Sequence, residues 1–210
     1  FQLGSLLSSV AMGSSENVKA ALDSLEEAAK ACGYDGVIYI SCASGMKKAE
    51  EASVGVDASY NYHFGTDGSR YDTNTTANLY QAKDTSTHTV PTATIGFRSV
   101  GWMDARYPIM NTEDFARLNK WVADEFLPMY EGEENWKRTT VMLSNWNEFG
   151  EGTYINPSKN NGEFGYLDGI REAYTDEKAD ASLNTVPTEE QKRRINRMYP
   201  SYKQMLIHEG

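Results

Sequence analysis

The feature of this chain that most constrains its fold is the alternation of strand-like and helix-like segments. Short runs of β-branched and apolar residues predict four strands, at residues 36–41, 54–64, 90–97 and 139–145. Apolar residues at helical spacing predict helices at residues 14–32, 43–52, 112–126 and 166–174. Strands that alternate with helices pair in parallel through crossover connections. The sequence therefore predicts an α/β protein with a parallel sheet.

Local signals place several boundaries. Ser14 and Thr112 are predicted helix caps, and Gly33 is the predicted stop of the first helix. Thr188 and Gln191 have the spacing of a capping box, which predicts one more helix near the end of the chain. Residues 65–87 are rich in Asp, Asn, Thr and Gly, and we expect them to form a loop.

The length bounds the architecture. A closed eight-stranded (β/α)8 TIM barrel typically needs about 250 residues, whereas this chain has 210. We therefore expect residues 1–175 to form the C-terminal part of such a barrel, and residues 176–210 to form a loop and a helix packed on it. A half-barrel leaves sheet edges unpaired, so we expect a homo-oligomer or a missing N-terminal half.

Composition excludes several classes of protein. A net charge of −10 argues against binding to nucleic acid, which needs a basic face. The sequence has no run of about 18 apolar residues, which a membrane span would need. The first residues resemble the middle of a longer chain, so a preceding targeting segment is possible and the compartment stays open. The cysteines, Cys32 and Cys42, and three widely spaced histidines have no metal-ligand spacing. We expect no metal and no cofactor.

The run from Ser144 to Gly152 holds the strongest functional signal. Glu148 and Glu151 lie three residues apart, directly after a predicted strand. Residues three apart on a strand point to opposite faces. Both acids therefore serve one site only if the chain turns there, and Gly150 and Gly152 allow a turn. Two carboxyl groups beside aromatic and amide groups are typical of sites that cleave glycosidic bonds. The alternative is a pair of surface acids that flank a turn.

Other residues are candidate contacts for a sugar, and each has a structural alternative. Trp146 and Trp102 stack on sugar rings or belong to the core, and Asn147 binds a hydroxyl or stabilises a turn. At least one of Tyr60 and Tyr62 is expected to be a packing residue. The remaining candidates are a rim pair that binds substrate or forms an ion pair, Asp104 and Arg106. His63 is predicted to be a polar residue at a loop edge.

These segments resemble glycoside hydrolase family 99, the endo-α-mannosidases, and the related WbsX-like proteins. The resemblance lies first in the run Asn147-Glu148-Phe149-Gly150-Glu151-Gly152, and the helix run at residues 165–171 is also similar. Upstream, residues 55–64, 90–92 and 101–104 resemble strand ends and loops of the family. Endo-α-mannosidases usually have Trp and His at the positions of Phe149 and Gly150.

The resemblance implies a TIM barrel that cleaves α-mannoside-like linkages with retention of configuration. It implies that Glu148 is the base that acts on the substrate's own 2-hydroxyl. It also implies that Glu151 is the general acid and then the general base. The expected partner is an oligosaccharide or polysaccharide substrate.

Two rival functions stay open from the sequence. WbsX-like proteins are often described as glycosyltransferases, which makes polysaccharide assembly the first rival, although no phosphate-binding loop is visible. The second rival is a carbohydrate-binding fragment that does not catalyse a reaction.

Overall fold

The computed structural model describes residues 3–7, 11–42, 47–98, 107–158, 163–178, 180, 182 and 188–194. The chain divides into two compact units, residues 1–178 and 179–210. In the second unit the structure describes a helix at residues 189–194. The predicted capping box is confirmed, because the backbone N–H of Thr188 donates to Gln191 Oε1 at 2.8 Å and the backbone N–H of Gln191 donates to Thr188 Oγ1 at 3.2 Å.

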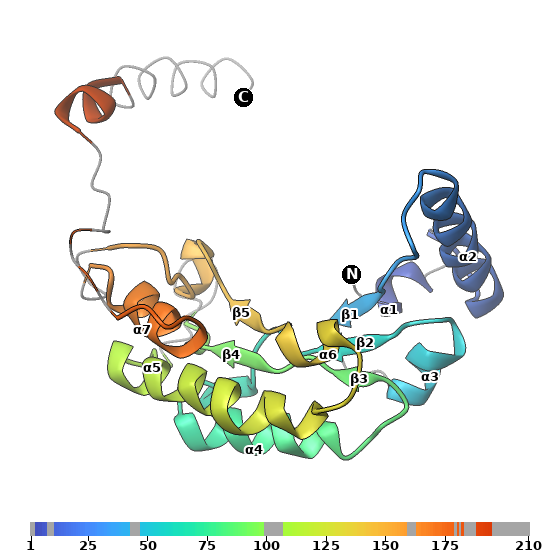
Figure 1. Ribbon diagram of the computed structural model, residues 1–210, viewed down its shortest axis with the longest axis horizontal. Coiled ribbons are helices and arrows are strands. Elements are labelled where there is room, and N and C mark those ends of the chain that lie inside the picture. The colour runs from blue at the N-terminus through green and yellow to red at the C-terminus, as the bar shows by residue number, and fades with distance from the viewer. Residues whose placement is uncertain are drawn as a thin grey trace. The chain divides into compact units, whose positions relative to one another are not determined.

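The first unit contains both strands and helices (Figure 1). Its strands are β1 (Ile40–Cys42), β2 (Ala58–Tyr60), β3 (His88–Thr89), β4 (Thr92–Thr94) and β5 (Met142–Ser144). Its α-helices are α1 (Leu3–Leu6), α2 (Ser15–Ala31), α3 (Lys48–Ser53), α4 (Tyr71–Ala82), α5 (Thr112–Trp121), α6 (Asn135–Thr139) and α7 (Gly165–Tyr174). Its other helical turns are η1 (Gly65–Asp67), η2 (Val122–Phe126), η3 (Leu127–Tyr130) and η4 (Phe149–Glu151).

The described strands pair in parallel, as predicted. One sheet has the order β1-β2-β3, and β4 pairs with β5 in a second sheet. The short connection between β3 and β4 links the two sheets, because Val90 N donates to Ser59 O at 3.0 Å and Met142 N donates to Pro91 O at 2.9 Å. Residues 88–94 therefore pair with β2 through their first half and with β5 through their second half. The order of neighbouring strands follows the order of the chain.

The main core lies where α5 and α7 pack together beside β4. The predicted apolar stripe of α5 and η2 is confirmed as buried: Phe115, Leu118, Trp121, Val122 and Phe126. The hydroxyl of Tyr166 on α7 donates to the backbone carbonyl of Met110, which precedes α5. The two helices approach closely at Gly169, where an added Cβ atom would lie 2.7 Å from the Cβ atom of Ala116. A larger residue at Gly169 would separate the helices.

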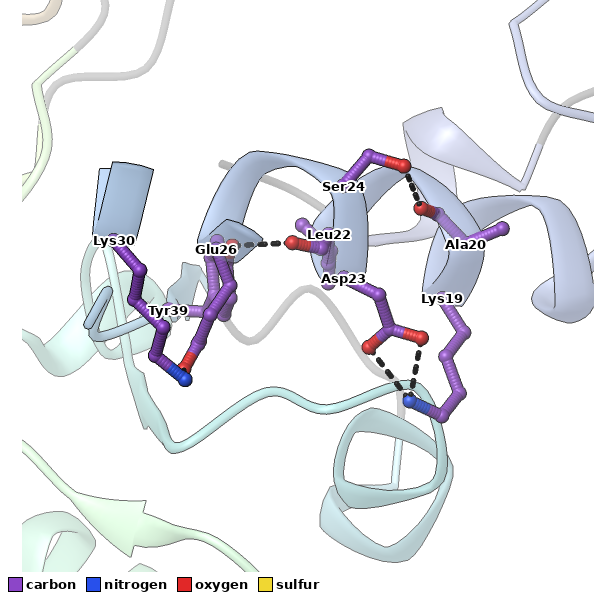
Figure 2. A network of polar contacts seen from close by, with 8 residues as sticks. All are labelled: Lys19, Ala20, Leu22, Asp23, Ser24, Glu26, Lys30 and Tyr39. Carbon is purple, nitrogen blue, oxygen red and sulfur yellow. Dashed lines mark hydrogen bonds and ion pairs between the residues drawn. The ribbon is translucent and has the colours of Figure 1, made fainter. Parts of the chain in front are cut away.

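Helix α2 begins as predicted, with the backbone N–H of Asn17 donating to the side chain of Ser14 at 3.2 Å. Only part of its apolar stripe is buried: Val18 is buried, whereas Leu25 is 53% exposed. Figure 2 shows how α2 is joined to the segment before β1: the hydroxyl of Tyr39 donates to the carbonyl of Leu22 at 2.6 Å. Surface ion pairs also lie along α2, including one between Lys19 and Asp23.

The loop expected at residues 65–87 is wrong over its middle, because α4 occupies residues 71–82. Two asparagines on this helix bind the backbone of β4. Asn78 accepts from Thr92 N and donates to Thr92 O, both at 2.9 Å, and Asn74 accepts from Thr94 N at 3.2 Å. Asparagine is a weak helix former. The tertiary hydrogen bonds of these buried side chains stabilise a helix that local propensity does not predict.

Several boundaries differ from the prediction in detail. Helix α5 is capped by Asn111, whose side chain accepts from Asp114 N at 2.8 Å, and not by Thr112. Cys42 is the last residue of β1 and is buried, whereas Cys32 caps α2 and is exposed. No helix in the described part of the chain has the length and apolarity needed to cross a membrane.

Candidate functional site

The predicted acid-bearing run forms a closed turn directly after β5. The peptide bond between Ser144 and Asn145 is cis. The turn is closed by Glu148 N, which donates to Thr153 O at 3.2 Å, and by Thr153 N, which donates to Glu148 O at 3.1 Å. Between these residues lies the single helical turn η4, and Gly152 follows it with a φ of 61°. The left-handed conformation that the turn requires is therefore found at Gly152 and not at Gly150.

Backbone contacts attach this turn to the neighbouring strand end. Arg98 N donates to Glu151 O at 2.7 Å, and Arg98 lies in the segment that follows β4. An added Cβ atom at Gly152 would lie 3.0 Å from Arg98 O. The side chain of Asn145 donates to Thr153 Oγ1 at 3.2 Å, and Thr153 is fully buried. These contacts fix the backbone of both glutamates against the carboxyl ends of β4 and β5.

Tyr62 brings a third strand end to the same place. It lies two residues beyond β2, and its hydroxyl donates to Glu151 Oε2 although the two residues are 89 positions apart in the sequence. Burial raises the pKa of the Tyr62 phenol, and so do its hydrogen bond to Glu151 and the charges of Glu151 and Glu148. A contact with the side chain of Asn145 acts in the opposite direction. The Tyr62 hydroxyl therefore lies within the electrostatic reach of both carboxylates.

The protonated phenol has a clear chemical role beside these acids. A phenolic hydroxyl can donate to an ionised carboxylate and can accept from a protonated one. A tyrosine phenol is protonated at neutral pH even at its ordinary pKa of about 10, and the pKa of Tyr62 is raised further, so Tyr62 can stay bound to Glu151 in either protonation state of that acid. Such a partner suits a carboxyl group that releases and then recovers a proton.

His63 lies at a loop edge, as predicted. It also has defined neighbours, since Gly65 N donates to His63 Nδ1 at 3.1 Å. Its ring stacks on Phe97, with centroids 4.9 Å apart, and meets the ring of Tyr62 edge to face, with centroids 5.8 Å apart. The imidazole therefore packs the segment after β2 against the segment after β4.

Three of the remaining candidates lie in the described part of the chain. Trp146 is 55% exposed and Asn147 is exposed, so neither belongs to the core. Tyr60 lies opposite Cys42 in the sheet, and burial together with contact with Cys42 raises its pKa. The structure thus brings Tyr62, but not Tyr60, to the two glutamates. Trp102, Asp104 and Arg106 lie outside the described residues.

Sequence reasoning missed an aromatic pair on the acid-bearing turn. Phe149 is 61% exposed, and its ring centroid lies 5.1 Å from that of Tyr154. The available signal was the position of Phe149 between the two candidate acids, in a segment that was already expected to turn. The described residues contain no group of three or more His, Cys, Asp or Glu side chains that is arranged to hold a metal ion.

The site thus consists of a turn with two carboxylates, a phenol whose pKa is raised by the charges of both, and exposed aromatic rings beside them. The chain matches no model of a known protein family, and no curated protein matches it either.

Proposed function

We propose that this protein acts on glycans, as a retaining glycoside hydrolase that cleaves α-mannoside-like linkages. The observation that carries the proposal is the position of Tyr62. Its hydroxyl donates to Glu151, and the charges of Glu151 and Glu148 raise its pKa. Glycosidic cleavage by two carboxyl groups needs both of them near one bond. The proposal is supported by one turn that carries both acids, with Glu151 bound to Tyr62 and the charge of Glu148 near enough to raise the pKa of the same phenol.

The proposed roles divide the work between the two acids. Glu148 takes the proton of the substrate's 2-hydroxyl, whose oxygen then displaces the leaving group and closes an anhydro-sugar ring. Glu151 gives its proton to the departing glycosidic oxygen. In the second half, Glu151 takes a proton from water, and the water oxygen bonds to the anomeric carbon and breaks the anhydro ring. Glu148 then gives the proton that it took in the first half back to the 2-hydroxyl oxygen. Two displacements at the same carbon retain its configuration.

The exposed rings supply the binding surface in this proposal. Trp146 and Phe149 flank Asn147 and Glu148 in the sequence, and both rings are more than half exposed. The C–H face of a pyranose ring packs on such rings, while Asn147 and the carboxylates bind its hydroxyl groups. This exposed surface also favours the second candidate function, a carbohydrate-binding protein without turnover.

The proposed fold is the second half of a (β/α)8 barrel. It is supported by parallel strands whose spatial order follows the chain, with α3, α4 and α5 in the connections. Candidate residues follow β2 and β5, at the carboxyl ends of the strands, where barrel enzymes place their active sites. The remaining strands would come from a longer chain or from a second copy.

Proton NMR of the first product tests the proposal. The protein is incubated with α-linked oligosaccharides, mannans included, and the anomeric signal of the first sugar released is recorded before mutarotation. We expect turnover with an α-anomer as the first product. A β-anomer would contradict the retaining mechanism. Binding of the oligosaccharides without any turnover would favour the carbohydrate-binding function.

A further inference from the structure

His63 lies between the two segments that hold Glu151. On one side its ring meets the ring of Tyr62 edge to face, with centroids 5.8 Å apart, and the hydroxyl of Tyr62 donates to the Glu151 carboxylate. On the other side it stacks on Phe97, with centroids 4.9 Å apart and an interplanar angle of 23°. Arg98 follows Phe97, and its backbone N–H donates to Glu151 O at 2.7 Å. The imidazole therefore links the segment that binds the Glu151 side chain to the segment that binds the Glu151 backbone.

A hydrogen bond fixes the orientation of the His63 ring. Gly65 N donates to His63 Nδ1 at 3.1 Å, so Nδ1 carries a lone pair and the proton of the neutral ring lies on Nε2. With this bond at one edge and the Phe97 ring against one face, the imidazole is held in one rotamer. A half-buried side chain held in this way presents a fixed surface to Tyr62.

The backbone before Tyr62 is anchored, but its phenol lies beyond the strand. Asn61 N donates to Thr92 Oγ1 at 3.1 Å, and the Thr92 hydroxyl donates to Asn61 O at 2.8 Å. These two bonds attach the chain to β4 directly before Tyr62. Tyr62 itself follows the end of β2 and is only half-buried. The direction of its phenol, on which the bond to Glu151 depends, is therefore set by neighbouring side chains, and His63 supplies an aromatic contact.

We propose that His63 is a positioning residue of the acid-bearing turn, which holds the Tyr62 phenol within hydrogen-bond reach of Glu151. Its effect on turnover rests on the proposed function, in which Glu151 is the acid and then the base. His63 acts through the ring of Tyr62 and needs no contact with the sugar. Loss of the His63 ring should therefore lower kcat and leave KM nearly unchanged, because the lost contact assists proton transfer and not substrate binding.

Two variants of His63 separate ring packing from the bond to Gly65. His63→Asn keeps an acceptor near the position of Nδ1 and removes the ring, whereas His63→Phe keeps a ring and removes the acceptor. We expect His63→Asn to lower kcat by up to roughly tenfold, the loss set by the Tyr62 hydroxyl itself, and His63→Phe to keep most of the wild-type kcat. The opposite order would show that His63 only stabilises the turn at Gly65, and it would overturn the proposal.

A double-mutant cycle tests whether His63 acts through Tyr62. In the Tyr62→Phe background the hydroxyl is absent, so His63→Asn should lower kcat further by less than about twofold. In the Tyr60→Phe background the missing hydroxyl is one that lies beside Cys42, and His63→Asn should lower kcat as much as it does in the wild type. Losses that multiply in the Tyr62→Phe background, or a change in KM alone, would contradict the proposal.

Carbon-13 NMR of the tyrosine Cζ atoms gives a readout that does not need turnover. The chemical shift of Cζ responds to the hydrogen bond that the phenol donates. The chain has 13 tyrosines, and Tyr62→Phe assigns the signal of Tyr62. Glu151→Gln gives the position of that signal when the carboxylate is lost. We expect the signal in His63→Asn to move toward its position in Glu151→Gln, and the signal in His63→Phe to stay near the wild type.

The two readouts distinguish a failure of the positioning role from a failure of the proposed function. If no glycan is turned over while the Tyr62 signal moves as expected, the proposed function fails and the positioning role stands. If glycans are turned over but the Tyr62 signal in His63→Asn keeps its wild-type position, the positioning role fails. Phe97→Leu removes the ring on which His63 stacks and should move the same signal in the same direction, so it serves if His63→Asn does not fold.

Discussion

Replacing Tyr62 by phenylalanine removes one hydroxyl group and leaves the ring in place. The lost contact is the bond from Tyr62 to Glu151 Oε2, which joins the end of β2 to the turn after β5. The ring still packs edge to face on His63. The change therefore acts on the carboxylate more than on the packing of the strand end.

The size of the effect follows from the burial of the two partners. A hydrogen bond to a charged group contributes about 1.5–3 kcal/mol when the group is well shielded from water. Tyr62 and Glu151 are both only partly buried, so water replaces part of the lost bond. We therefore take the lower end, about 1.5 kcal/mol, which corresponds to roughly a tenfold loss of kcat/KM on an α-linked glycan.

The matched control is Tyr60→Phe. It removes the same hydroxyl group two residues earlier, where the side chain lies beside Cys42 and not beside the acids. Steady-state kinetics of both variants, with urea unfolding of each, separate catalysis from stability. Equal losses of kcat/KM in the two variants, or a larger loss in Tyr60→Phe, would refute the role given to Tyr62.

Two further predictions concern the folded state. Asn78→Ala removes both hydrogen bonds to the buried backbone of Thr92 and should lower the free energy of unfolding by about 2–4 kcal/mol. Urea unfolding measures this loss. A loss under about 0.5 kcal/mol, the range of an ordinary surface change, would show that α4 does not depend on this side chain. Burial raises the pKa of the Glu51 carboxyl group above its ordinary value of 4.5, so the folded state binds the carboxyl proton more tightly than the unfolded state does. The contribution of Glu51 to the free energy of unfolding is therefore lost as pH rises above about 4.5. Glu51→Gln should therefore become more stable relative to the wild type as pH rises from about 4.5 toward neutrality, and a stability difference that does not change with pH would contradict this.

The sequence predicted those parts of the fold that local signals determine. Helix α5 was predicted from its apolar stripe, and the buried ring of Phe115 lies where that stripe places it. Helix α4 was missed because Asn74 and Asn78 stabilise it through contacts with β4. Tertiary hydrogen bonds of this kind leave no periodic pattern in the sequence.

In the candidate site, too, the sequence predicted only what local signals determine. The turn that presents Glu148 and Glu151 was predicted from two acids, two glycines and the preceding strand. The contact between Tyr62 and Glu151 was not predicted, because it depends on which strand ends meet. Both residues follow parallel strands, so only the pairing of the strands brings them together.

The central claim is that the two glutamates of one turn act together on a glycosidic bond. The most direct test is release of sugar from α-linked oligosaccharides by the wild type, Glu148→Gln and Glu151→Gln. Glu27→Gln, on the exposed face of α2, is the control. We expect each change in the turn to lower turnover by roughly a hundredfold or more, with no loss in the control. Turnover that survives both changes would contradict the claim.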